Sequence, residues 1–327
     1  MRRMFFIVGP TATGKSELAA DVAHELNAEI VSADAFQIYG GLDLLTAKPD
    51  ASTLAKAPHH LIGTMPLSEE MNAEKYRRAA TSAIGQINSS GKPAVIVGGS
   101  GLYIKALTHG LAPLPTPDPR LRKKLNAMSL DALHLQLIEL DPETARKIDV
   151  KNRRRLVRAL EIYLLTGKPT SVVVGGVAAV AEGVDLGDLG DVRARSAPAA
   201  TSPKSIPATG VFAFRDREEL YERINRRVEA MFEKGVIEEV RAAGPTSATA
   251  SQMIGLRDIR ELLQGKISLL QCIAQIQQAT RRYAKRQLTW FRRQTNFSPL
   301  NLSLLSHNEA VKWILLRMRS GVRTRDD

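Results

Sequence analysis

Short apolar runs alternate with helical periodicity along the first hundred residues. The runs at 4–8, 29–33 and 94–97 have the length of buried strands, and the last contains no polar residue, as in a parallel strand covered on both faces. Apolar positions three and four residues apart predict helices over 15–26 and 73–90. Strands that alternate with helices predict an α/β fold in which helices flank a parallel sheet.

The pattern changes in the middle of the chain. Four prolines between residues 110 and 119 form a stiff crossing segment, and 120–170 has only helical periodicity. Residues 171–210 are rich in Gly, Ala, Pro, Ser and Val, as in a flexible insertion. The apolar run at 211–214 predicts a return to the sheet. We therefore expect a core formed by 1–112 and 211–327, an inserted all-helical segment at 113–170, and a flexible low-complexity insertion at 171–210.

The chain continues with two strongly periodic segments and several turns. Helices are expected over 216–235 and about 268–293, and a third short strand is expected near 58–62. Asp131 is predicted to cap a helix through Leu133, and Asp141 precedes Pro142 at the start of another.

The loop between the first strand and the first helix carries the clearest chemistry. Two bounding glycines, with Lys15 and Ser16 at the helix start, form the pattern of a P-loop in its strand–loop–helix context. Backbone N–H groups at a helix N-terminus attract phosphate, Lys15 adds positive charge, and the Ser16 hydroxyl suits Mg²⁺. The loop indicates a phosphate or diphosphate ligand without selecting ATP. Its predicted ligand-binding residues are Gly9, Pro10, Thr11, Ala12, Thr13, Gly14, Lys15 and Ser16.

Asp34 directly follows the second predicted strand. Because α/β sheets bind ligands beyond the carboxyl ends of their strands, Asp34 is expected near the P-loop, as a magnesium ligand, a general base or a helix cap. The strand at 94–97 ends in Gly98-Gly99 and not in the acid of many P-loop ATPases, which counts against an ordinary ATPase. Ser100, in this second glycine-rich turn, is expected to point toward the same site.

The composition indicates a class of binding partner through its net charge. The formal net charge is +12 and the pI about 9.9, which favours a polyanionic partner, nucleic acid first. Five cations without an acid between them occur at 151–158, and six at 281–293 are interleaved with aromatic residues, a pattern suited to RNA phosphates and unpaired bases. Solvated basic helix faces are the alternative. Arg223 and Arg227 stand one turn apart and are expected to bind an anion together.

The cysteine content and the length of the apolar segments indicate a cellular compartment. The single cysteine, Cys272, excludes a disulfide framework and favours a reducing compartment. No segment approaches the roughly 20 apolar residues of a membrane span. We expect a cytoplasmic monomer.

Six segments occur in an order typical of one family. They are the P-loop, Asp34 with Gln37-Ile38-Tyr39, Thr46-Ala47-Lys48-Pro49, Pro58-His59-His60, Gly98-Gly99-Ser100-Gly101-Leu102-Tyr103, and Lys285-Arg286-Gln287 with Thr289-Trp290-Phe291-Arg292. In this order, and over most of its length, the chain resembles the tRNA dimethylallyltransferases, the bacterial tRNA isopentenyltransferases. The resemblance implies a P-loop NTPase-like core.

It also implies a prenyl transfer. Dimethylallyl diphosphate, held with Mg²⁺, would give its dimethylallyl group to the exocyclic amine of the adenine 3′ of the anticodon, in tRNAs that read codons beginning with U. Asp34 matches the family's general base, Thr11 and Arg227 match groups that hold the diphosphate, and Ser100 and Arg122 match positions associated with activity. Segments that match tRNA contacts comprise Asp34, Ala35, Phe36, Gln37, Arg154, Arg155, Leu156, Val157, Arg158, Gln252, Met253, Ile254, Gly255, Leu256 and Arg257.

Chemistry agrees with this implication. An adenine amine is a weak nucleophile and needs a carboxylate to accept its proton, while cations stabilise the diphosphate that leaves. Base flipping exposes an atom that stacking would shield.

The chain departs from the family pattern at a few positions. Ala35 stands where Ser is usual, Leu45 where Gly is usual, Leu256 where Tyr is common and Ser100 where Thr is common. Three other functions stay open on the residues alone: a small-molecule P-loop kinase, an adenylate isopentenyltransferase acting on free nucleotide, and a non-catalytic RNA-binding protein. The kinase predicts ATP turnover, the second needs no tRNA surface, and the third needs no Lys15, Ser16 and Asp34 together.

Overall fold

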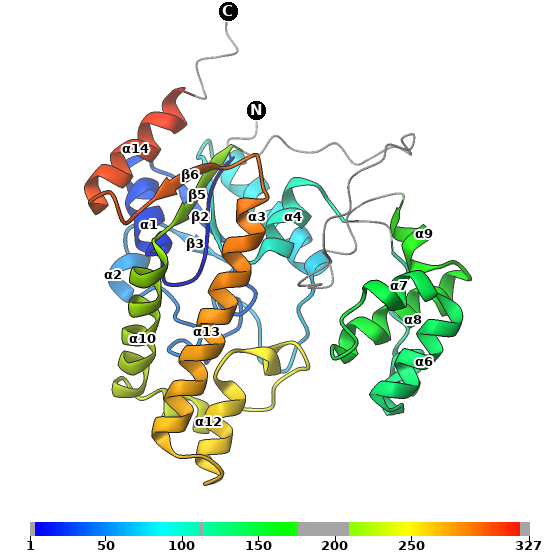
Figure 1. Ribbon diagram of the computed structural model, residues 1–327. Coiled ribbons are helices and arrows are strands. Elements are labelled where there is room, and N and C mark those ends of the chain that lie inside the picture. Colours follow the sequence, from blue (N-terminus) through cyan, green and yellow to red (C-terminus); the bar gives the residue numbers. More distant parts are fainter. Residues whose placement is uncertain (1–3, 112–113, 176–208, 321–327) are drawn as a thin grey trace, which may run out of the picture. The chain divides into compact units, whose positions relative to one another are not determined.

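The computed structural model describes residues 4–111, 114–175 and 209–320. It contains two compact units, one formed by Met1–Thr108 with Ile206–Asp327 and one by His109–Ser205 (Figure 1). Most of the insertion predicted at 171–210 lies outside the described residues. No helix within the described ranges is long and apolar enough to cross a membrane.

The elements of the first unit alternate as the apolar pattern predicts. In chain order they are β1 (Met4–Val8), α1 (Lys15–Glu25), β2 (Glu29–Ser32), α2 (Ala51–Leu54), β3 (His59–His60), α3 (Ala73–Ser89), β4 (Ala94–Gly98), α4 (Gly101–Thr108), β5 (Gly210–Phe214), α10 (Arg217–Glu233), α11 (Val236–Ala242), η1 (Ala250–Gln252), α12 (Leu256–Leu263), α13 (Leu269–Arg292), β6 (Ser298–Asn301) and α14 (His307–Ser320).

One parallel sheet of six strands organises this unit, in the order β3-β2-β4-β1-β5-β6. Val8 at the end of β1 pairs with Gly98 of β4 and Phe212 of β5, so the carboxyl ends of the central strands meet at one edge. That edge is where the P-loop, the Asp34 segment and the second glycine-rich turn emerge. The predicted parallel α/β core and the return of 211–214 to the sheet are confirmed.

Alternating side chains of β1 face two different apolar layers. Phe6 and Val8 belong to the core beneath α3, α4 and α13, whereas Phe5 and Ile7 pack with α1 and α14 on the other face. The sequence pattern left β6 and α14 unpredicted. β6 is a four-residue edge strand containing Pro299, and α14 supplies the buried Ile314 to the second layer.

The second unit contains only helices among its described residues. They are α5 (Pro119–Ala127), α6 (Leu130–Leu140), α7 (Pro142–Lys147), α8 (Arg153–Thr166) and α9 (Thr170–Gly175). Leu133, Leu137, Leu156 and Leu160 are fully buried in its core. Asp141 caps α7 as predicted, but Ser129 caps α6, because the Ser129 hydroxyl accepts the Ala132 N–H and Asp131 lies within the first turn.

Candidate active site

The conformation of the P-loop depends on Gly9 and on two arginines that bind its backbone. Gly9 has φ 154°, and a Cβ there would lie 2.0 Å from the Ala213 carbonyl oxygen, so only glycine permits this approach of β5. On the outer side, the Nε–H groups of Arg223 and Arg215 donate to the carbonyl oxygens of Ala12 and Thr13, each at 2.9 Å. Because N–H and C=O point in opposite directions across a trans peptide, the next amides face inward, as in an anion-binding nest.

Lys15 begins α1 and is partly buried beside this loop. Its Nζ donates to the Pro10 carbonyl oxygen at 3.1 Å. Burial lowers the pKa of Lys15 to about 8, although the charge of Asp34 partly opposes this shift and Arg227 adds to it. A bound anion would stabilise the charged ammonium.

Arg227, contributed by α10, is a second partly buried cation, and its Nε atom is fully buried. Its Nε has no hydrogen-bond partner among the described residues, and burial lowers the pKa of its guanidinium to about 10. Arg227 lines a pocket together with Thr11 and Asp34. Because a buried donor without a partner is unfavourable, this geometry fits an anionic ligand at the P-loop. Arg223 uses its Nε–H on the Ala12 carbonyl, and the joint binding of an anion by Arg223 and Arg227 stays a prediction.

Asp34 lies where two hollows meet. One hollow contains Thr11 and Arg227, and the other contains Lys15 and Ser16, so the expected proximity of Asp34 to the P-loop is confirmed. Asp34 Oδ1 accepts the N–H groups of Phe36 at 2.9 Å and Gln37 at 3.2 Å. These two bonds fix the direction of the carboxylate, and no hydrogen bond within the described residues engages Oδ2.

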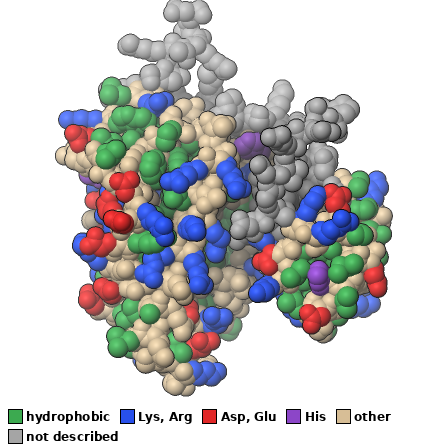
Figure 2. Space-filling view, viewed as in Figure 1, with side chains coloured by type: hydrophobic (Ala, Val, Ile, Leu, Met, Phe, Trp, Pro, Cys, Tyr) green, Lys and Arg blue, Asp and Glu red, His purple; other side chains and the backbone are tan. Residues whose placement is uncertain are grey.

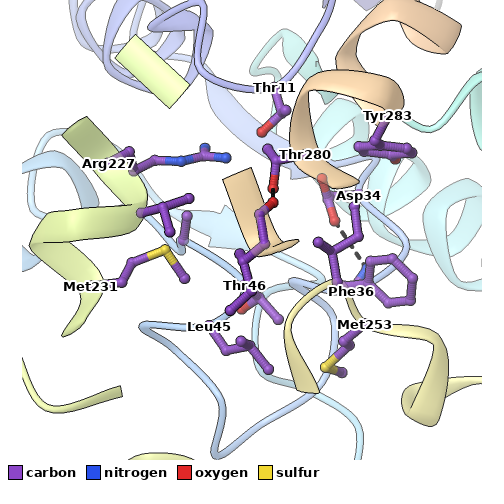
Figure 3. Close-up of a pocket in the computed structure, with 14 residues that line it drawn as sticks. Thr11, Asp34, Phe36, Leu45, Thr46, Arg227, Met231, Met253, Thr280 and Tyr283 are labelled. Atoms are coloured by element: carbon purple, nitrogen blue, oxygen red, sulfur yellow. Dashed lines mark hydrogen bonds between the residues drawn. The ribbon is translucent and has the colours of Figure 1, made fainter. Parts of the chain in front are cut away.

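An apolar wall completes the pocket beside Asp34. Thr11 and Arg227 lie around the polar end, and Leu45, Met231 and Met253 lie below them in the view of Figure 3. The pocket is also lined by Phe36, Thr46, Ala47, Val228, Ile254, Ile276, Thr280 and Tyr283. A site with cations at one end, a carboxylate in the middle and apolar walls suits an organic diphosphate that reacts beside a base.

The 42–48 loop, which forms part of this wall, is held from two sides. Gln37 Nε2 donates to the Ala47 carbonyl at 2.9 Å. The Glu239 carboxylate on α11 accepts the amides of Leu44 and Leu45 at 2.8 and 2.9 Å. Leu45 does not have positive φ, whereas Ala47 does at 49°. The absence of glycine at 45 is therefore tolerated.

Ser100 is buried and bound to the backbone beside the base. Its Oγ accepts the Ala35 N–H at 2.9 Å, and its own N–H donates to the Ala33 carbonyl at 3.2 Å. The hydroxyl thus positions the Asp34 segment from a neighbouring turn. A direct catalytic role of Ser100 stays a prediction.

Comparisons with known proteins agree with this geometry. A family model described as IPP transferase matches residues 37–294. The chain is 41% identical to the tRNA dimethylallyltransferase 1 of Citrifermentans bemidjiense, over 88% of this chain and 89% of that protein. It is 39% identical to the tRNA dimethylallyltransferase of Akkermansia muciniphila, over 88% and 90%.

A solved structure shows the same architecture. The tRNA isopentenylpyrophosphate transferase of Bacillus halodurans has a TM-score of 0.68 to this chain at 30% identity, covering all of both chains. The chain belongs to the IPP transferase family. The family resemblance and the P-loop-like fold inferred from the motifs are thereby confirmed, and the named relatives of this chain in the family are dimethylallyl-transferring enzymes.

Within the helical unit, an acid joins two residues implied in activity and tRNA contact. Glu161 is fully buried and accepts two bonds from Arg122, at 2.9 and 3.0 Å. It also pairs with Arg158, which donates to the Pro115 carbonyl at 2.9 Å. Whether Arg122 is catalytic stays a prediction, but its guanidinium is fixed by Glu161.

The expectation of uncompensated cations at 151–158 needs correction at Arg158. Glu161 pairs with Arg158 from one helical turn away but shares its single negative charge with Arg122. Arg153 donates to the carbonyls of Asn126 and Met128, which leaves its positive charge uncompensated within the described residues. Arg155, Leu156 and Val157 are buried, so their side chains pack within the unit and are not available to tRNA. Arg154 is the exposed cation of the predicted 154–158 contact segment.

The basic face expected along α13 is present. Figure 2 shows Lys and Arg side chains gathered over this helix, and the exposed members are Arg282, Lys285, Arg286, Arg292 and Arg293. Of the three aromatic residues interleaved with these cations, Phe291 belongs to the core, whereas a stacking role for the others stays a prediction. The Phe291 ring is 1% exposed in the core, with Trp290 edge-on against it, whereas Tyr283 lines the pocket.

The predicted tRNA-contact segment at 252–257 has two kinds of position. Gln252 and Arg257 are exposed, whereas Met253 and Ile254 line the pocket. Leu256 is 1% exposed in the core, so a leucine here serves packing and its side chain offers no surface to tRNA.

Sequence reasoning assigned no role to three residues that shape the site, which are Arg215, Glu239 and Gln287. Each forms hydrogen bonds with backbone groups that are distant in the sequence, and the residue type alone does not predict such partners. Only Gln287 fell within a quoted motif.

Proposed function

We propose that this chain transfers a dimethylallyl group from dimethylallyl diphosphate to the exocyclic amine of the adenine 3′ of the anticodon, in tRNAs that read codons beginning with U. The observation that supports this proposal most directly is the position of Asp34 between the partly buried cations Lys15 and Arg227, beside an apolar pocket. Membership of the IPP transferase family supports the same reaction.

In the proposed step, these residues account for the leaving group and for the proton. The adenine nitrogen forms a bond to the allylic carbon as the bond from that carbon to the diphosphate oxygen breaks. The diphosphate leaves with the electron pair, and its negative charge is stabilised by Lys15, Arg227 and the inward amides of the P-loop. Asp34 accepts the proton of the amine, since an alkylated adenine amine must lose one proton to become neutral.

Mg²⁺ is the proposed cofactor, and the residues present fit it. The Ser16 hydroxyl lines one hollow with Ser32, whose buried Oγ has no hydrogen-bond partner in the described structure. Oxygen donors of this kind suit a hard divalent cation. When bound, the ion neutralises charge on the leaving diphosphate.

The proposed acceptor is the anticodon stem-loop of tRNA. The exposed cations of α13 suit its phosphates, and the apolar pocket wall suits an adenine flipped out of the loop. We propose that the enzyme acts on this acceptor in the cytoplasm, as a monomer.

An acceptor assay tests the function. The protein is incubated with Mg²⁺ and labelled dimethylallyl diphosphate, together with unmodified tRNA, AMP or no acceptor. Label is expected in tRNA alone and in the anticodon-loop fragment after nuclease digestion. Transfer to AMP instead would favour a free-nucleotide enzyme, and hydrolysis of ATP without transfer would favour a kinase.

A further inference from the structure

Gln287 is a buried amide on the inward face of α13, with 6% of its surface exposed. Its two ends make hydrogen bonds of opposite sense. Oε1 accepts the Thr11 N–H at 2.9 Å, and Nε2 donates to the Gly99 carbonyl at 2.9 Å. Because one end must accept and the other must donate, the orientation of the amide is determined by its two partners.

The second glycine-rich turn is fitted closely around this side chain. A Cβ at Gly99 would lie 2.2 Å from Gln287 Nε2 and 2.9 Å from the Gly9 carbonyl oxygen. A Cβ at Gly101 would lie 2.7 Å from the Trp290 ring, one helical turn beyond Gln287. The glycines of this turn therefore permit contact with α13, and they are explained without a second phosphate loop.

The same turn leads directly to the proposed base. Ser100 follows Gly99 and accepts the Ala35 N–H, next to Asp34. A continuous set of hydrogen bonds thus runs from the Thr11 amide through Gln287 to the 99–100 turn and on to the Asp34 segment. It also means that the Thr11 amide is engaged by protein, so the hydroxyl of Thr11 is the group left for the ligand.

We propose that Gln287 is a positioning residue that sets the separation between Thr11, beside the leaving diphosphate, and Asp34, which accepts the proton. The inference rests on the proposed function. A small error in this separation would misalign the leaving group and the base during transfer, while tRNA binding on the outer face of α13 would be unaffected.

Two substitutions test the role. Gln287→Met keeps the length and removes both hydrogen bonds, and is expected to lower kcat by about 10- to 100-fold. Gln287→Glu is nearly isosteric: a neutral carboxyl group can accept from Thr11 and donate to Gly99, whereas a carboxylate cannot donate. The ratio of its kcat to that of the wild type is therefore expected to rise as pH falls. The other residues of the site are the same in both proteins, so the ratio reports on the new group.

Controls separate positioning from folding. Gln275→Glu makes the same chemical change at an exposed position of α13 and is expected to match the wild type at every pH. Thermal unfolding and tRNA binding are measured for each variant, and tRNA binding is expected to stay within about twofold of the wild type, because this binding surface is on the other side of the helix.

The outcomes are distinguishable. Transfer by Gln287→Glu equal to the wild type at every pH would overturn the inference, as would parallel loss of folding, tRNA binding and activity in both variants. If the wild type itself transfers no dimethylallyl group to tRNA, the proposed function fails, which is a different result.

Discussion

Lys15 and Arg227 are cations that the fold partly buries before any ligand arrives. Burial lowers the pKa of both groups, and Asp34 opposes the shift in each case. A desolvated ammonium interacts with an anion more strongly than a hydrated one, because water screens it less. The affinity of the site for diphosphate should therefore depend on the protonation state of Lys15.

This dependence has a definite sign. The pKa of Lys15 in the free site is about 8, and a bound diphosphate anion would raise it. Above pH 8 binding must take up a proton, so the affinity for dimethylallyl diphosphate falls as pH rises, by up to about tenfold per pH unit. Calorimetry at pH 7 and pH 9, in buffers of different ionisation enthalpy, measures this proton uptake. Lys15→Arg should lose the dependence, and absence of uptake by the wild type at pH 9 would contradict the assignment.

Asp34→Asn separates the base from its geometry. Asparagine retains an oxygen to accept the Phe36 N–H, so the local turn should persist. The rate of transfer is expected to fall by about 10²- to 10⁴-fold, since a positioned base contributes that much. Single-turnover transfer at a saturating tRNA concentration measures the effect. Asp131→Asn, at an exposed position of α6, serves as the control. A variant that transfers at the wild-type rate would exclude Asp34 as the base.

At the scale of elements, α13 connects two functions through its opposite faces. Cys272, Ile276, Thr280, Ala284 and Gln287 recur at intervals of three and four residues on the buried side. The cations occupy the other side. One helix therefore presents charge outward and contacts the P-loop inward, as its sequence period requires.

Helix α11 contributes differently, through one carboxylate that holds a loop. Glu239→Gln would place an amide NH₂ against one of the two backbone N–H groups of Leu44 and Leu45. The free energy of unfolding should fall by about 1–3 kcal/mol, because a buried donor loses its acceptor. Urea denaturation measures this change. Glu238→Gln, at an exposed neighbour paired only weakly with Arg241, should be nearly neutral. Equal stability of the two variants would show that the loop does not depend on Glu239.

For the whole molecule, the effect of the 12 surplus positive charges on tRNA binding depends on where they lie. On α8 it is partly cancelled by the buried Glu161, which pairs with Arg158. On α13 and its C-cap Arg293, five cations remain exposed. The electrostatic contribution to tRNA binding should therefore come mainly from α13 and not in proportion to the net charge.

Salt dependence tests this placement. Each phosphate contact contributes about 0.7 to 0.9 to the slope of log K against log salt concentration. Lys285→Gln should reduce the slope for tRNA by about that amount, whereas Lys312→Gln on α14 should leave it unchanged. Filter binding of tRNA between low and moderate salt measures both slopes. Equal reductions would indicate that net charge, and not the α13 face, controls binding.

Much of the fold was predictable because its signals are local. The P-loop, the strand before it and the helix after it follow from residues within about one element of each other, and Asp34 follows from its position after β2. Two short strands and one helix with weak hydrophobic periodicity were harder to predict from the sequence. β3 has only two residues, β6 contains a proline, and α14 has a pattern that becomes meaningful only against the sheet.

By itself, the sequence determined the α/β core, the phosphate-binding loop, the candidate base and the basic helix, since these depend on residue type and spacing along the chain. Tertiary structure alone decided which polar groups meet. Glu161 reaches Arg122 across 39 residues, and Gln287 reaches Thr11 across 276. Nothing in the local pattern pairs them, because a buried hydrogen bond is selected by proximity after folding and not by separation in the chain.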